Sequence, residues 1–220
     1  MEQTPRSVSE LGTQHPRPGG RIMTVAIQTR AVVAGNADVL HALCDESVSI
    51  AVWNRDSPVN DMALDGLRNL RFTASIASLA GQLDRELASA GYHAGACHDL
   101  LATDIVALAR RFGRVMHLDE IEIRLEHVTT DACKKFHGDY VTARLICTYI
   151  GPGTQWLDGP DAEECGCGEP HDIQQMRPGD VAMFKGRIWS ENHPAIHRSP
   201  PIEALGLERL VLVINPPMPR

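Results

Sequence analysis

The sequence predicts an α+β fold in which helices come first and strands follow. In the first half of the chain, apolar residues recur mainly at helical intervals of three and four. After Leu118 the pattern changes to alternation, with Ile121 and Ile123 set among charged residues. Helices followed by strands are typical of helices packed outside a sheet or barrel. We therefore expect a helical layer at about 36–118 and a strand core at about 119–216.

Three helices are expected in the first half. A short helix covers 36–44, and the β-branched run at 48–53 predicts a strand after it. A long amphipathic helix is expected over 61–90, because apolar residues recur at helical spacing and Gly91 supplies a C-terminal stop. The same periodicity predicts a further helix over 99–115.

The second half contains β-like segments separated by turn signals such as GPG and RPGD. The expected strands are 120–128, 139–150, 153–158, 180–185 and 207–214.

Length and composition indicate one domain, which we expect at 23–220. The 220 residues are 43% hydrophobic, enough for a sizeable core. Residues 1–22 are rich in Pro, Gly, Ser and charge, which predicts a disordered tail.

Charge and hydropathy disfavour several classes of partner and location. The formal net charge of −7 disfavours nucleic acid and anionic lipid. No apolar run reaches the roughly 18 residues that a membrane span needs, and a signal-peptide pattern is absent. The six cysteines are irregularly spaced, which disfavours a secreted disulfide framework. We expect a cytoplasmic protein.

The segment CKKFHGDYVTARLIC carries the candidate chemistry. His137 and Asp139 stand two residues apart at the start of a β-like run, so they are expected to point to one side of a strand. Continued alternation puts Ala143 and Leu145 on that same side and Arg144 on the other. An imidazole and a carboxylate supply two metal ligands, and a facial metal site needs a third donor from elsewhere.

His197 is the candidate for the third donor. His193 competes with it, because both lie in the loop ENHPAIHR and spacing alone does not separate them. We prefer His197, which lies nearer the last strand. Arg209 opens that strand, where an arginine is costly to bury unless an anion meets it. Arg198 is a second candidate for binding an acidic ligand.

The order of these motifs resembles the iron(II)- and 2-oxoglutarate-dependent oxygenases. It consists of H-x-D, a G-D before an apolar strand, a later His and an Arg at the head of the last strand. The resemblance implies a double-stranded β-helix core of the jelly-roll or cupin-like type. It implies that His137, Asp139 and His197 bind iron(II), and that Arg209 pairs with the distal carboxylate of 2-oxoglutarate. In that superfamily a Ser often follows the Arg by two residues, whereas this chain has Val211.

A closer resemblance covers about residues 48–216. The motifs CKKFHGDY, RLICTYIGPGTQWL, a late KG, HRSPP and RLVLVI are similar to a bacterial family of unknown function, numbered 1826. That resemblance implies no particular reaction.

Cysteines near these motifs leave other metal sites open. Cys133 could join the two histidines and the aspartate to close a tetrahedral zinc site, which would be structural or regulatory. Cys165, Cys167 and His171 form a second metal-like cluster on a polar loop, although exposed cysteines of no fixed role are the simpler interpretation.

Three hypotheses for function follow. The first is an iron(II)- and 2-oxoglutarate-dependent oxygenase acting on an unidentified, small-molecule or other substrate. The second is a non-catalytic zinc- or iron-binding protein in metal homeostasis or sensing. The third is an inert barrel that binds a small acid through Arg209 and Arg198.

Overall fold

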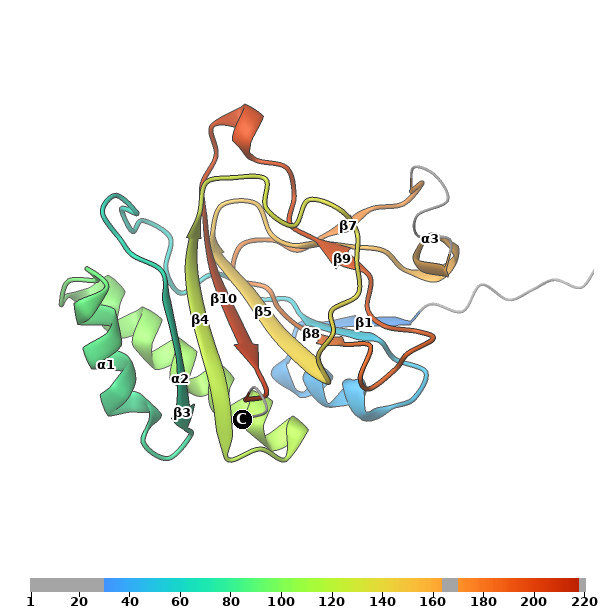
Figure 1. Ribbon diagram of the computed structural model, residues 1–220, viewed down its shortest axis with the longest axis horizontal. Coiled ribbons are helices and arrows are strands. Elements are labelled where there is room, and N and C mark those ends of the chain that lie inside the picture. Colours follow the sequence, from blue (N-terminus) through green and yellow to red (C-terminus); the bar gives the residue numbers. More distant parts are fainter. Residues whose placement is uncertain (1–29, 164–169, 218–220) are drawn as a thin grey trace, which may run out of the picture.

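The computed structural model describes residues 30–163 and 170–217 (Figure 1). The tail predicted at 1–22 lies outside the described residues, as do Cys165 and Cys167.

The described elements are strands, α-helices and two short 3₁₀ helices. In chain order they are β1 (Ala31–Ala34), η1 (Ala37–Cys44), β2 (Ile50–Trp53), β3 (Leu70–Ser75), α1 (Leu79–Ser89), α2 (Ala96–Met116), β4 (Glu120–Val128), β5 (Ala143–Ile150), β6 (Gln155–Trp156), α3 (Gly159–Glu163), β7 (Gln174–Gln175), β8 (Val181–Lys185), β9 (His197–Arg198), η2 (Glu203–Leu205) and β10 (Arg209–Asn215).

The main sheet has seven strands in the order β1-β2-β8-β5-β10-β4-β3. It is mixed, because β1 pairs with β2 in parallel while the other neighbouring strands run antiparallel. All seven residues of β10 are buried, as expected for a strand near the middle of a sheet covered on both faces.

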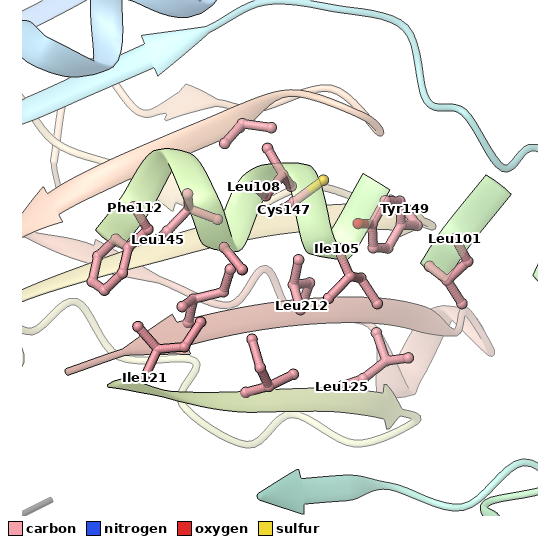
Figure 2. Packing of buried hydrophobic residues seen from close by; sticks show 14 of the residues in the cluster. Leu101, Ile105, Leu108, Phe112, Ile121, Leu125, Leu145, Cys147, Tyr149 and Leu212 are labelled. Carbon is pink, nitrogen blue, oxygen red and sulfur yellow. The ribbon is translucent and has the colours of Figure 1, made fainter. Parts of the chain in front are cut away.

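Helices α1 and α2 cover one face of this sheet (Figure 1). Apolar residues of α2, including Leu101, Ile105 and Phe112, pack against Leu145 of β5 and Leu212 of β10 (Figure 2). The amphipathic period of α2 is therefore used to bury its apolar stripe against the sheet.

A three-stranded sheet, in the order β7-β6-β9, lies against the other face. A second apolar cluster joins the two sheets, with Trp156 and Met176 packed in one group with Phe184, Val211 and Val213 of the main sheet. Two sheets facing each other across an apolar layer are consistent with a jelly-roll core. The candidate site lies between these sheets.

The prediction of a helix over 61–90 is wrong for the first half of that range. The helix α1 covers only 79–89, and residues 70–75 form the edge strand β3 instead. Leu70 and Ala74 are buried, whereas Arg71 is exposed, so this stretch alternates like a strand. Pairing with β4, which is distant in sequence, decides its structure.

The main sheet also takes β1, β2 and β3 from before residue 119. The main sheet therefore extends across the boundary that was expected near residue 118 between a helical layer and a strand core. The helices predicted at 36–44 and 99–115 are present with small shifts, and β4 has the predicted limits. Of the segment 139–150, only the part from Ala143 onward is a strand.

The turn after β5 requires glycine. Gly151 has a φ of +81°, and a Cβ at this position would lie 1.9 Å from the carbonyl oxygen of Glu208. This close approach places the turn directly beside Arg209 at the start of β10.

None of the helices in the described residues has both the length and the hydropathy needed to cross a bilayer.

Candidate metal centre

An isolated β-bridge brings His137 and His197 together. The amide of each residue donates to the carbonyl of the other, and both N–O distances are 3.0 Å. Residues paired in this way carry their side chains on the same side of the ladder. The two imidazole rings accordingly lie close, with their centroids 4.9 Å apart.

Asp139 completes the cluster. Its Oδ1 lies 3.6 Å from Nε2 of His137, and its Oδ2 lies 3.2 Å from Nε2 of His197. One ligand atom from each of the three residues lies within 4.8 Å of the others. Donors bound to one ion at about 2.1 Å and at right angles stand about 3 Å apart, so small side-chain movements suffice to coordinate a metal.

The outer nitrogens of both histidines are already engaged. Nδ1 of His137 lies 2.8 Å from the carbonyl oxygen of Lys135, and Nδ1 of His197 lies 3.2 Å from that of Ala195. A carbonyl oxygen only accepts, so each Nδ1 carries the hydrogen and the neutral ring has its lone pair on Nε2. Metal-binding histidines are commonly oriented in this way.

The carboxylate of Asp139 has an unusual environment. Its Oδ2 is buried and has no hydrogen-bond partner of suitable geometry among the described residues, although Nη1 of Arg144 lies 2.7 Å away. Burial raises the pKa of Asp139, but interactions with His137, His197 and Arg144 outweigh it and hold the pKa well below its usual range. An ionised carboxylate with an oxygen that lacks a hydrogen bond, beside two Nε2 atoms that become acceptors when their rings are neutral, fits a divalent cation.

The three residues line a pocket of about 140 Å³ together with Arg209. Arg209 is 1% exposed, and among the described residues its guanidinium donates only to uncharged groups: the carbonyl of Pro152 at 2.7 Å and the hydroxyls of Thr148 and Thr154 at 3.2 and 3.3 Å. Burial lowers its pKa to about 10.

No carboxylate in the described residues forms an ion pair with Arg209. Asp180 instead accepts from Arg177 and from the amide of Arg55, and Glu208 contacts His127. The pocket therefore contains a buried positive charge without a counter-charge, next to the metal-type cluster.

The alternation expected from His137 does not hold in β5. Arg144 lines the pocket beside His137 and Asp139, whereas Ala143 and Leu145 face the helices. The reason is that residues 138–142 are irregular and the strand begins only at Ala143, so the side of the sheet is reset. The expectation from strict alternation, which put Arg144 on the face away from the site, is therefore wrong.

Thr148 and Thr154 were missed as site residues. Thr148 lies on the same face of β5 as Arg144, so a strand start placed at Ala143 could have identified it. Thr154 lies outside the strands, and no sequence pattern marks it.

Other candidate ligands lie apart from the cluster. His193 is exposed and is not among the clustered donors, so the fold brings His197 and not its competitor to Asp139. Cys133 lines the same pocket, but its sulfur is not part of the cluster either. His171 is exposed on the surface. A closed site that uses the Cys133 thiolate therefore has no support in this geometry.

Arg198 follows His197 in β9. Its Nε donates to Oε1 of Gln155 at 2.7 Å, and its guanidinium lies 4.3 Å from the ring centre of Phe136. It lines the small pocket and also a larger one beside it.

A family model described as "Protein of unknown function (DUF1826)" matches residues 34–215. No curated protein matches the chain.

Several solved structures resemble the chain. They include dioxygenase for auxin oxidation 1 from Arabidopsis thaliana in complex with 2-oxoglutarate, with 16% identity and a TM-score of 0.37 over 73% of this chain and 71% of that chain. A bsmA homologue from Methylobium petroleophilum has 13% identity and a TM-score of 0.40 over 84% and 93% of the two chains. A prolyl-4-hydroxylase from Pseudomonas putida has 15% identity and a TM-score of 0.35 over 68% and 88%.

Proposed function

Because the chain belongs to DUF1826, a family whose description states no activity, we propose a function from its site: an iron(II)- and 2-oxoglutarate-dependent oxygenase with a double-stranded β-helix core. One observation carries the proposal. A His-Asp-His cluster and a buried arginine without an acidic partner share one pocket. The first can hold a metal, and the second can hold a carboxylate.

The metal would be held by His137, Asp139 and His197. Two imidazoles and one carboxylate on one side of an ion leave the remaining positions for other ligands, as in non-haem iron(II) oxygenases. Bound iron(II), together with 2-oxoglutarate, would supply the redox chemistry with dioxygen.

The protein's own groups orient the metal ligands and neutralise the charges of the carboxylates. The carbonyls of Lys135 and Ala195 keep Nε2 of each histidine free for the metal. Arg144 balances the charge of Asp139 and restrains its carboxylate. Arg209, with its planar guanidinium, would receive the distal carboxylate of 2-oxoglutarate in a site with almost no solvent exposure.

Two observations favour a second candidate, a non-catalytic metal-binding protein. The carboxylate of Asp139 already has a cationic neighbour, because Nη1 of Arg144 lies 2.7 Å from Oδ2. The pocket of about 140 Å³ is also small. Such a centre could hold iron or zinc with only a small co-ligand, in metal homeostasis or sensing.

The deciding experiment is calorimetry on the full-length protein loaded with iron(II) in the absence of oxygen. We expect 2-oxoglutarate to bind only when the metal is present. Glutarate, which has the same two carboxylates but lacks the 2-oxo group, should bind much more weakly. Metal binding without detectable binding of millimolar 2-oxoglutarate would reject the oxygenase and support the second candidate. Absence of metal binding would reject both.

A further inference from the structure

A larger pocket of about 660 Å³ adjoins the candidate metal centre. It shares His137 and Arg198 with the smaller pocket that contains Arg209. The side chain of His137 is 37% exposed, whereas those of His197 and Asp139 are 5% and 13% exposed. Solvent therefore reaches the cluster mainly on the side of His137, from the larger pocket.

The described walls of this pocket are mainly basic. They carry five cations and two carboxylates: Arg30, Lys134, Lys135, Arg187 and Arg198 against Glu163 and Glu191.

Most of these cations have no acidic partner. Lys134 lies 3.4 Å from Asp131, but the other four form no ion pair in the part of the chain that the structure describes. Arg187 and Arg198 donate instead to neutral oxygens, the carbonyl of Gly138 at 3.3 Å and the amide of Gln155 at 2.7 Å. In a protein with a formal net charge of −7, this concentration of unpaired positive charge marks the pocket as a site for an anion.

The pocket also has an apolar part. The guanidinium of Arg198 stacks over the ring of Phe136, and Pro194 and Ile196 also line the pocket. Pockets that combine apolar surface with a few polar groups suit organic molecules better than inorganic ions. Its volume is in the range of small-molecule sites.

We propose that this larger pocket binds the substrate, and that the substrate is a small organic anion with a carboxylate or phosphate group. The acidic group is held by the unpaired cations, and the carbon skeleton extends toward His137. The assignment as substrate rests on the proposed oxygenase function, but the assignment of an anion site does not.

The test is a thermal-shift screen of the full-length protein loaded with zinc, a redox-inert ion, in the presence of saturating 2-oxoglutarate. The probes are aromatic and aliphatic carboxylates and phosphate monoesters, each paired with its neutral amide or alcohol. We expect some anions to raise the melting temperature while their neutral counterparts do not. Their dissociation constants, measured by calorimetry, should rise with salt concentration.

Charge-reversal variants locate the site. Lys135→Glu and Arg187→Glu should each weaken the best anion at least tenfold. Arg85→Glu makes the same change in net charge on the exposed face of α1 and should leave binding unchanged. The proposal is overturned if no anion binds, if neutral counterparts bind equally well, or if Arg85→Glu weakens binding as much.

The same screen without metal and 2-oxoglutarate separates the two proposals. Anion binding that depends on Lys135, in a protein that fails to bind 2-oxoglutarate with metal, would retain the anion site and reject the oxygenase. If 2-oxoglutarate binds but no anion binds in the larger pocket, the oxygenase is retained and the anion site is rejected.

Discussion

Nε2 of His197 lies 3.2 Å from Oδ2 of Asp139, and both side chains are largely buried. Nδ1 of His197 faces the carbonyl of Ala195, which leaves a lone pair on Nε2 of the neutral ring. Two acceptors at this distance are held together only by a proton or a metal ion between them. A bound metal ion would take the place of that proton and be coordinated by both atoms.

The first prediction concerns metal stoichiometry. The full-length protein should bind one divalent ion, and His137→Ala or Asp139→Ala should abolish binding, because two remaining donors hold a metal poorly. Metal content measured after dialysis against a known free concentration checks this.

Two control variants accompany that measurement. His193→Ala and Cys133→Ser should keep the metal, since neither residue belongs to the donor cluster. Loss of the metal from the Cys133 variant would instead support a closed site with a thiolate ligand.

The second prediction concerns Arg209. Arg209→Ala should weaken 2-oxoglutarate binding by about 2–5 kcal/mol, the usual cost of removing one partner of a buried charge pair. Metal affinity should stay almost unchanged, because the guanidinium donates to Pro152, Thr148 and Thr154 and not to the cluster. Calorimetry with the metal-loaded variant measures both.

The matched variant is Arg209→Lys, which keeps the charge but loses the two-pronged guanidinium. It should bind 2-oxoglutarate with intermediate affinity. Equal affinity in wild type and in Arg209→Ala would show that the arginine serves only the structure.

Most strands of the second half could be predicted because their signal is local. In β4, alternation appears within nine residues and gave the observed limits. The edge strand β3 was missed because its pairing with β4 joins residues about 50 positions apart, and local leucine spacing favoured a helix. Secondary structure at such positions is decided by tertiary contacts.

The candidate site was predictable in composition but not in orientation. Spacing in H-x-D and the position of His197 were enough to propose the three donors that the fold brings together. The side of β5 that faces them depends on the irregular residues 138–142, which separate His137 from the start of the strand at Ala143. For that reason Arg144 was expected on the opposite side of the strand from the site.

The third prediction concerns the buried network that joins α2 to the sheet. Arg55 contacts both oxygens of Asp104, at 2.5 and 2.7 Å, and the hydroxyl of Tyr149 donates to Oδ2 at 2.8 Å. Asp104→Ala should lower the free energy of unfolding by about 3–5 kcal/mol, because it leaves a buried guanidinium unpaired. Denaturant unfolding measures this. Asp84→Ala, on the exposed face of α1, should change it by less than about 0.5 kcal/mol; similar losses in both variants would contradict a special role for the network.

The fourth prediction concerns alkaline stability. Burial raises the pKa of Cys147 to about 12, whereas a cysteine in the unfolded chain has a pKa of about 8.5. Between these values the unfolded chain loses a proton that the folded chain keeps, so stability falls as pH rises. Between pH 8 and about 10, the free energy of unfolding of Cys147→Ala should therefore fall by about 2 kcal/mol less than that of the wild type. Unfolding curves at both pH values test this, and equal losses would contradict the raised pKa.

The last prediction links the turn after β5 to the site. Gly151 and Gly206 both have positive φ, at +81° and +61°, so alanine at either position costs about 1–2 kcal/mol of backbone strain. Only at Gly151 would the new Cβ also meet backbone, 1.9 Å from the carbonyl oxygen of Glu208. Overpacking of this kind adds about 1–3 kcal/mol to the cost of the strain. Relieving it requires a shift of the Glu208 backbone, which also moves Arg209, the residue after Glu208. Gly151→Ala should therefore destabilise the protein more than Gly206→Ala and should also weaken 2-oxoglutarate binding, whereas Gly206→Ala should leave that affinity intact. Unfolding curves and calorimetry on the two variants measure these effects; an unchanged affinity in a destabilised Gly151→Ala protein would mean that the position of Arg209 does not depend on this turn.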